Sequence, residues 1–223
     1  MNKELLVQAL TKYLAGLAAV ALLLFLSAGT LKYWNGWLFL GILFVPMLVL
    51  GVFLLMKDPE LLQKRLQTKE TEPEQKRIVL LSGVMFLAGF ILCGLNARFS
   101  WLVMPKWTAV FSAAVFLAGY ALYARVMREN EYLSRTVEVQ TGQKVVDTGL
   151  YGVVRHPMYL ATLLLFLSTP LVLGSPLSFL IFLIYPWILV KRIQNEEQVL
   201  EEQLEGYREY KKKVRYKLIP LIW

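Results

Sequence analysis

Six apolar runs follow one another along this chain, and their lengths restrict the folds that it can adopt. The runs cover residues 13–31, 34–56, 78–95, 107–123, 158–173 and 177–190. A transmembrane helix needs about 20 predominantly apolar residues, and the first four runs come close to that length. The hydrophobic share of the 223 residues is 57%, whereas a soluble domain has roughly 45–50%. The runs therefore predict an all-α, polytopic integral membrane protein with about six hydrophobic segments.

The last two runs are shorter than the others and are joined by Gly174, Ser175 and Pro176. Glycine and proline are typical of tight connections between elements. A helical hairpin that is tilted, or that thins the bilayer locally, accommodates such short segments. We expect two regions along the chain: residues 1–124 form a scaffold of transmembrane helices, and residues 125–223 hold a polar loop, the hairpin and a polar tail.

The lysine and arginine residues predict the orientation in the membrane. With six crossings and a cytoplasmic amino terminus, only Lys32, Arg98 and Lys106 of the 24 lysine and arginine residues fall on the outer side. This bias follows the positive-inside rule. We therefore expect both termini and the long polar loop in the cytoplasm. The net charge of +8 then belongs to a surface that faces anionic membrane lipids, not to a nucleic-acid interface.

Two familiar kinds of binding site are missing from the sequence. The chain has one histidine, His156, and one cysteine, Cys93, so it has no Cys/His cluster for a metal ion and no internal disulfide. It also lacks the Gly-x-Gly-x-x-Gly loop of a soluble dinucleotide-binding or Rossmann domain. We expect no metal, and any cofactor site must be of another type.

One motif surrounds the single histidine, in residues 149–159 with the sequence Gly-Leu-Tyr-Gly-Val-Val-Arg-His-Pro-Met-Tyr. Pro157 disfavours a helical conformation at the residue before it but suits the first turn of a helix. Arg155 and His156 are therefore expected at the start of a helix. Unpaired N–H groups and the helix dipole at such a start favour an anion.

A second motif begins at the end of the last apolar run, with Arg192, Glu196 and Glu197. Arg192 and Glu196 are four residues apart, which in a helix is also the spacing of an ordinary surface ion pair. Further along, Leu200, Leu204 and Tyr207 continue the face of Glu196, although Gly206 weakens the helix there. Residues 218–223 are predicted to form an extended apolar patch.

Together the two motifs resemble the isoprenylcysteine carboxyl methyltransferase family. The first is similar to its Gly-x-Tyr-x-x-x-Arg-His-Pro-x-Tyr signature, and the second to its Arg-x-x-x-Glu-Glu, Tyr-x-x-Tyr and terminal proline, here Tyr207, Tyr210 and Pro220. The resemblance covers roughly residues 125–223. It implies an integral membrane enzyme that uses S-adenosyl-L-methionine, with phospholipid N-methyltransferases as distant relatives.

The resemblance also implies roles for particular residues. Arg192 would hold the acceptor carboxylate, Glu196 the amino group of the cofactor's methionine part, and Glu197 is a neighbouring candidate for the same task. The residues that would contact the cofactor are Gln140, Val145, Val146, Gly149, Tyr151, Arg155, His156, Tyr159 and Glu196. Taken one by one, the tyrosines are equally typical of a membrane interface, and residues 139–146 of an ordinary polar loop.

Several functions remain open at this point. The main prediction is methylation of the carboxylate of an isoprenylcysteine-like or other amphiphilic acceptor, which would enter sideways from the bilayer. Methylation of a lipid amine is an alternative, and it would require a base, for which His156 is the first candidate. An NADPH-dependent membrane reductase of related architecture is a further alternative. A scaffold without catalytic function would leave the gathering of both polar motifs on one side unexplained.

Overall fold

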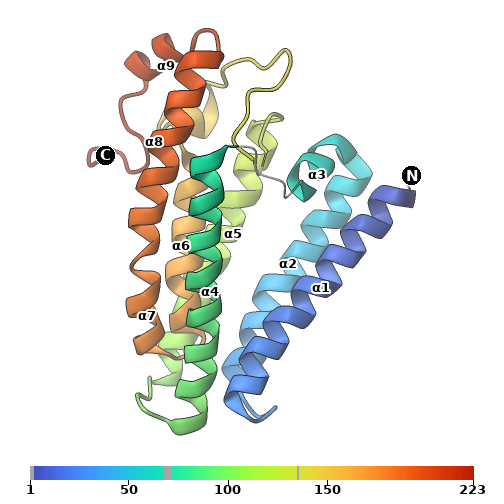
Figure 1. Ribbon diagram of the computed structural model, residues 1–223, viewed down its shortest axis with the longest axis vertical. Coiled ribbons are helices and arrows are strands. Elements are labelled where there is room, and N and C mark those ends of the chain that lie inside the picture. Colours follow the sequence, from blue (N-terminus) through green and yellow to red (C-terminus); the bar gives the residue numbers. More distant parts are fainter. Residues whose placement is uncertain (1–2, 68–71, 135) are drawn as a thin grey trace.

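The computed structural model describes residues 3–67, 72–134 and 136–223. Within these residues the chain forms α-helices and one short 3₁₀ helix, and this described part contains no β-strand (Figure 1). The elements are α1 (Lys3–Ala28), α2 (Trp34–Lys57), α3 (Pro59–Leu66), α4 (Pro73–Phe99), α5 (Lys106–Glu129), η1 (Gly149–Gly152), α6 (Pro157–Val172), α7 (Pro176–Phe182), α8 (Tyr185–Gln203) and α9 (Tyr207–Lys213). The predicted all-α class is confirmed.

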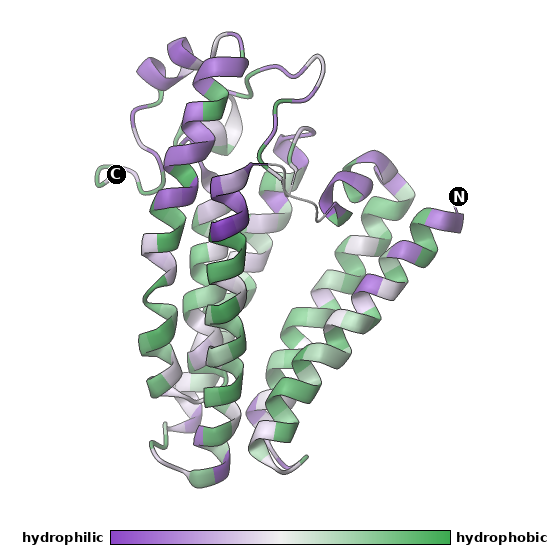
Figure 2. Cartoon of the chain, in the orientation of Figure 1, coloured by the Kyte–Doolittle hydropathy of each residue, from purple (hydrophilic) through white to green (hydrophobic). Residues whose placement is uncertain are grey.

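Five stretches are long and apolar enough to cross a membrane. They are α1, α2, α4, α5 and the stretch Pro176–Gln203, which combines α7 and α8. Helix α6 is apolar as well but has only 16 residues. Figure 2 shows that these helices are hydrophobic along their middle parts and more hydrophilic toward their ends. The chain is thus a multi-pass membrane protein, and its last two apolar segments form the predicted hairpin.

The long helices alternate in direction, so the two ends of the chain lie toward the same end of the molecule (Figure 1). The loop that follows α5 and the short helix α9 lie at this end too. This arrangement agrees with the common side that the charge distribution predicts for both termini and the polar loop. That this side is the cytoplasmic one remains a prediction.

Prolines and short polar caps set several helix starts. Pro59, Pro73, Pro157 and Pro176 stand in the first turns of α3, α4, α6 and α7. Proline suits this position because its missing N–H has no partner within the helix anyway. At the turn of the hairpin, Ser175 Oγ also accepts a hydrogen bond of 3.3 Å from the Ser178 backbone N–H. The hairpin predicted from Gly174, Ser175 and Pro176 therefore has a capped and well-defined turn.

Glycines bring α4 close to its neighbours. A Cβ atom added to Gly94 would lie 2.7 Å from the backbone oxygen of Leu24, so α1 and α4 pack almost backbone to backbone there. A Cβ on Gly89 would lie 2.3 Å from the ring of Phe182 in α7. The pair α1–α2 lies close to α4 at the end of the molecule opposite the chain termini and diverges from it toward the end that holds them (Figure 1). The polar end of the molecule is consequently built mainly by α4, α6, α8 and the segments after α5 and α8.

The carboxy-terminal part differs from the prediction in two places. Helix α8 ends at Gln203, and Leu204 and Gly206 separate it from α9, so the expected single helical face is interrupted. Gly206 takes φ +81°, which favours glycine and ends the helix. The prediction that residues 218–223 are extended is wrong. They turn back on themselves, because the backbone N–H groups of Leu218 and Ile219 both donate to the carbonyl oxygen of Trp223.

Candidate active site

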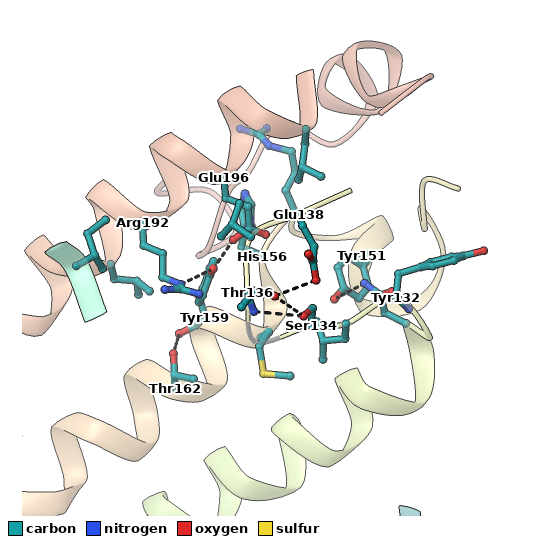
Figure 3. Close-up of a pocket in the computed structure, with 18 of the residues that line it drawn as sticks. Tyr132, Ser134, Thr136, Glu138, Tyr151, His156, Tyr159, Thr162, Arg192 and Glu196 are labelled. Atoms are coloured by element: carbon teal, nitrogen blue, oxygen red, sulfur yellow. Dashed lines mark hydrogen bonds and ion pairs between the residues drawn. The ribbon is translucent and has the colours of Figure 1, made fainter. Parts of the chain in front are cut away.

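A cavity of about 480 Å³ lies where α4, α6, α8 and α9 meet the loop that follows α5 (Figure 3). Its polar part is lined by Tyr132, Ser134, Thr136, Glu138, Tyr151, Arg155, His156, Tyr159, Arg192, Glu196 and Tyr207. Its apolar part follows the membrane-spanning helices and is lined by Ile78, Val79, Phe86, Phe166, Tyr185, Ile188 and Leu189. The cavity therefore joins a polar chamber to an apolar extension.

The first motif leads into helix α6, and the backbone N–H groups of its residues Arg155 and His156 are already hydrogen-bonded. The backbone N–H of Arg155 donates to the carbonyl oxygen of Tyr216 at 2.9 Å, and that of His156 donates to Lys217 at 2.8 Å. The carboxy-terminal segment thus pairs with the residues before Pro157. These two N–H groups are therefore occupied by a distant part of the chain, and the expected anion preference of the helix start stays a prediction.

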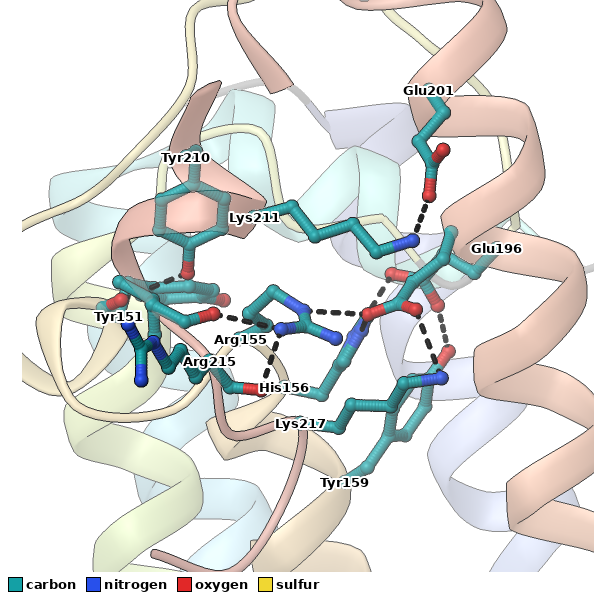
Figure 4. Close-up of polar contacts among 12 residues, drawn as sticks. Tyr151, Arg155, His156, Tyr159, Glu196, Glu201, Tyr210, Lys211, Arg215 and Lys217 are labelled. Carbon is teal, nitrogen blue, oxygen red and sulfur yellow. Dashed lines mark hydrogen bonds and ion pairs between the residues drawn. The ribbon is translucent and has the colours of Figure 1, made fainter. Parts of the chain in front are cut away.

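Glu197 forms the centre of a buried ionic cluster. Its carboxylate lies 2.7 Å from Arg155 Nε, 3.2 Å from His156 Nε2 and 3.1 Å from Lys217 Nζ (Figure 4). Glu197 is 3% exposed and Arg155 5% exposed. A buried carboxylate is tolerable only with such partners, since desolvation of an unpaired charge is costly. Glu197 does not line the cavity, so its contacts support a structural role in place of the expected catalytic one.

Arg155 belongs to the same cluster. Besides its bond to Glu197, its Nη1 donates to the carbonyl oxygens of Val214 at 2.7 Å and Arg215 at 2.9 Å (Figure 4). The side chain reaches the wall of the cavity, yet its guanidinium holds the carboxy-terminal segment against the start of α6. The structure thus gives Arg155 a clear function in the fold.

Arg192, Tyr159 and Glu196 form a second chain of contacts, and this one faces the cavity (Figure 3). Arg192 Nε donates to the hydroxyl of Tyr159 at 2.9 Å, and that hydroxyl donates to Glu196. His156 stacks on the Tyr159 ring with 5.7 Å between centroids, and its Nδ1 lies 3.8 Å from Glu196 Oε1. The structure therefore brings the two motifs together around one polar chamber, although they are far apart in sequence.

Tyr151 closes another side of the chamber. Its hydroxyl accepts a hydrogen bond from Asn130 at 3.0 Å, and its backbone oxygen accepts one from the hydroxyl of Tyr210 at 2.8 Å. Burial raises the pKa of the Tyr151 phenol, which therefore keeps its proton at neutral pH. The ring lines the cavity with its polar tip anchored.

The loop that follows α5 contributes some of the expected contacts but not all. Val145 and Val146 line the cavity, as does Gln143. Gln140 does not line it, because its amide donates to the backbone oxygen of Tyr132 at 2.6 Å and braces the loop. The glutamine that reaches the cavity is thus three residues further along than the one we expected.

Gly149 does not line the cavity either, and the structure gives a different reason for it. It has φ +58°, and an added Cβ would lie 2.5 Å from a carboxylate oxygen of Glu129. The same carboxylate accepts a 2.7 Å hydrogen bond from the backbone N–H of Leu150. Gly149 is therefore needed for the turn that carries Tyr151 into the chamber.

Two groups of residues in the site were missed from the sequence. Thr136 Oγ1 lies 3.0 Å from Ser134 Oγ and donates to Glu138 at 3.0 Å, which places a polar row on the chamber wall (Figure 3). Gln75 of α4 is fully buried and donates to the backbone oxygen of Arg192 at 3.3 Å, so it fixes α8 at the position of the second motif. A glutamine beside Pro73 in a charged segment offered no signal for this contact.

A multi-pass, all-helical fold with a polar chamber and an apolar extension defines a membrane protein suited to hold a polar small molecule beside an apolar group. Residues 110–202 match the model of the isoprenylcysteine carboxyl methyltransferase (ICMT) family, the same family that the two motifs resemble. The matched segment runs from α5 into α8 and includes His156, Arg192 and Glu196.

A solved structure of the eukaryotic intramembrane Ras methyltransferase ICMT is similar to this chain. The TM-score is 0.59 and the sequence identity 20%, over 96% of this chain and 77% of that one. At this identity the likeness establishes the fold. The amino-terminal helices, for which the sequence supported no family resemblance, are included in the shared architecture.

Three curated relatives match parts of the chain. The Delta(14)-sterol reductase TM7SF2 of Mus musculus is 34% identical over 91 residues, 40% of this chain and 22% of the relative. The Delta(14)-sterol reductase of Methylotuvimicrobium alcaliphilum is 24% identical over 135 residues, 54% and 32% respectively. The protein-S-isoprenylcysteine O-methyltransferase of Schizosaccharomyces pombe is 33% identical over 100 residues, 38% and 42% respectively. The chain spans less than half of the length of each of these relatives.

Proposed function

We propose that this protein is an S-adenosyl-L-methionine-dependent methyltransferase of the membrane, which methylates the carboxylate of an isoprenylcysteine-like or other amphiphilic acceptor. One observation carries the proposal. The segment that matches the family model contains both motifs, and the fold places Arg192 and Glu196 beside His156 and Tyr159 on the wall of one cavity. We further propose that this cavity opens to the cytoplasm, in line with the distribution of basic residues.

The donor set of the chamber fits the proposed cofactor. Glu196 offers a carboxylate to an ammonium group, and its side chain is partly exposed, at 24%, on the chamber wall. Val145 and Val146 offer an apolar wall for a purine, and the Tyr159 ring can lie near a sulfonium cation. Glu138 offers an acceptor for ribose hydroxyls. The acidic and aromatic groups among these residues are suited to the ammonium and sulfonium charges of S-adenosyl-L-methionine.

The acceptor would use the other part of the cavity. Arg192 stands where the polar chamber meets the apolar extension along α4, α6 and α8. Its planar guanidinium matches a carboxylate with two parallel hydrogen bonds. Val79 of the lining is 42% exposed, so the extension reaches the surface of α4. An acceptor with an apolar tail can thus enter from the bilayer with its carboxylate toward Arg192.

The proposed chemistry asks for orientation and desolvation. Bound S-adenosyl-L-methionine supplies a methyl group on a positively charged sulfur, which a carboxylate can attack in line. Arg192 and Glu196 would hold the two reactants, and the Tyr159 hydroxyl between them fixes their separation. Reactants held in this way gain rate because little orientational freedom is left to lose. The buried walls around His156 and Tyr151 exclude water from the chamber.

A carboxylate acceptor and an amine acceptor make different demands on His156. An amine must lose a proton during methylation, whereas a carboxylate need not. His156 is 5% exposed, and its Nε2 lies 3.2 Å from Glu197 in the buried cluster. If Nε2 donates to Glu197, Nδ1 is the ring nitrogen that an amine acceptor would need as a base, and it lies 3.8 Å from Glu196 Oε1.

The two sterol reductases among the relatives raise NADPH as a rival ligand. The chamber wall carries the carboxylates of Glu138 and Glu196, which would repel the phosphate groups of a dinucleotide. The guanidinium of Arg155 already donates to Glu197 and to two backbone carbonyls. The same lining also carries Arg65, Lys144 and Arg192, so the charge of the chamber does not by itself decide between the two ligands, and direct titration with each ligand does.

Calorimetric titration of the detergent-purified protein with S-adenosyl-L-methionine, and separately with NADPH, tests the proposal. We expect binding of S-adenosyl-L-methionine alone. Transfer of radiolabelled methyl to S-farnesyl-N-acetylcysteine should then give a product that base hydrolyses, as an ester requires. A base-stable product would identify an amine acceptor, and binding of NADPH would overturn the proposal.

A further inference from the structure

Tyr207 has a buried hydroxyl without a hydrogen-bond partner. Among the described residues, two buried side-chain atoms lack one: Gln75 Oε1 and Tyr207 OH. Only Tyr207 lines the cavity, and it is 4% exposed. Buried polar groups are nearly always hydrogen-bonded, so an exception calls for an explanation. A ligand in the cavity can supply the partner that the protein itself does not.

The position of Tyr207 is well fixed by its surroundings. It begins α9 directly after Gly206, and its ring lies 5.7 Å from that of Tyr210, measured between centroids. Tyr207, Tyr210 and Leu204 belong to one buried cluster. The Tyr210 hydroxyl donates to the backbone oxygen of Tyr151 at 2.8 Å. Two neighbouring tyrosines on one helix therefore differ in a single respect that matters here, since one hydroxyl is bonded and the other is not.

The charges around Tyr207 keep its hydroxyl protonated. Burial raises the pKa of the phenol above its ordinary value, and the carboxylates of Glu197 and Glu196 raise it further, against a smaller opposite effect of Arg155. At neutral pH the group is therefore a hydrogen-bond donor. A donor in the cavity lining that has no acceptor in the protein is suited to an acceptor oxygen of a ligand.

We propose that the Tyr207 hydroxyl donates a hydrogen bond to the α-carboxylate of bound S-adenosyl-L-methionine. This inference rests on the proposed function. In an amino acid the ammonium and the carboxylate are attached to the same carbon, so their binding groups must lie close together. Glu196 offers the acceptor for the ammonium, and Tyr207 offers a neutral donor on the wall of the same cavity. Both residues line the same chamber.

The test compares Tyr207→Phe with Tyr210→Phe by calorimetric titration of each full-length variant with S-adenosylhomocysteine. A hydrogen bond to a charged group contributes about 1.5–3 kcal/mol, so Tyr207→Phe should weaken binding by roughly tenfold or more. Because it removes an unpaired buried hydroxyl, it should not lower the melting temperature of the ligand-free protein. Tyr210→Phe should lower that temperature, because it breaks the bond to Tyr151. Unchanged affinity in Tyr207→Phe would overturn the inference.

A second ligand identifies the contacted atom. Decarboxylated S-adenosylmethionine lacks the α-carboxylate, so Tyr207→Phe and the unmodified protein should bind it equally well. A loss of affinity for this ligand too would overturn the assignment to the carboxylate. If the unmodified protein binds neither ligand, the proposed function itself fails. That outcome is distinct from normal binding by both proteins, which would refute only the role of Tyr207.

Discussion

The site contains two arginine–glutamate pairs with opposite roles. Arg155 and Glu197 are both buried and are joined directly at 2.7 Å. Arg192 and Glu196 line the cavity, and the Tyr159 hydroxyl lies between them. The same two residue types thus form a buried structural cluster and a ligand-facing pair, although Glu196 and Glu197 are consecutive in the sequence.

The difference shows that burial decides which carboxylate stabilises the fold and which one is available to a ligand. Glu197 has three partners, of which Arg155 and Lys217 are cationic, and these partners come from the residues before α6 and from the carboxy-terminal segment. It therefore holds two distant segments together. Glu196 lies on a different face of the same helix, where its side chain is accessible to the chamber. Adjacent residues in a helix point in directions about 100° apart, so neighbours in sequence serve different tasks.

The largest expected effect is that of Glu197→Ala. This change leaves Arg155 and Lys217 without their shared carboxylate, and breaking a buried ion pair costs about 3–5 kcal/mol. We expect a much lower melting temperature and a carboxy-terminal segment that proteases cleave readily. Glu196→Ala is the matched control and should leave the melting temperature nearly unchanged. An equal fall in melting temperature in both variants would contradict the different roles of the two pairs.

Arg192→Lys should act on turnover with little effect on the fold or on cofactor binding. Lysine keeps the charge but loses the planar fork that matches a carboxylate. A small misplacement of a reactant can lower the rate by roughly a hundredfold, and we expect a loss of about that size in methyl transfer. Calorimetry with S-adenosyl-L-methionine should give an affinity close to that of the unmodified protein. Comparable losses of turnover and affinity would show that Arg192 serves the cofactor instead.

Glu196→Gln should reduce cofactor affinity by roughly tenfold, because an amide replaces the charged acceptor for the ammonium group. The control ligand is methylthioadenosine, which lacks the amino-acid part of the cofactor. Its affinity should not depend on this substitution, as measured by calorimetry. A parallel loss for methylthioadenosine would mean that the variant disturbs the adenosine part of the site.

The smallest effect is expected from a third ion pair, on the surface. Lys213 lies 2.7 Å from Asp147 and lowers the pKa of that carboxyl group below its ordinary value. A lowered pKa contributes stability above the ordinary value of about 3.9, and this contribution is lost as the pH falls through the lowered pKa. Melting temperatures measured from about pH 5 downward should therefore fall slightly less steeply in Lys213→Met. A steeper fall would contradict the pairing.

Much of this architecture could be predicted from local patterns. Apolar run lengths predicted the membrane-spanning segments, Pro157 marked a helix start, and Gly174, Ser175 and Pro176 marked the turn of the hairpin, as the structure confirms. In the site, the motifs predicted His156, Tyr159, Arg192 and Glu196 on one cavity. Predictions failed where a residue meets a distant partner. Gln140 braces its own loop, and nothing near Gln75 in the sequence indicates its contact with α8.

The sequence by itself determined the helical membrane architecture, because helix formation and membrane insertion depend on residues close together in the chain. It also determined which polar groups gather at one end, since the apolar runs leave them no other place. Only the tertiary structure decided which of Glu196 and Glu197 faces the chamber and which is buried against the carboxy-terminal segment. That choice depends on the rotation of α8 against α6 and on the return of residues 214–217, and no local pattern encodes either of them.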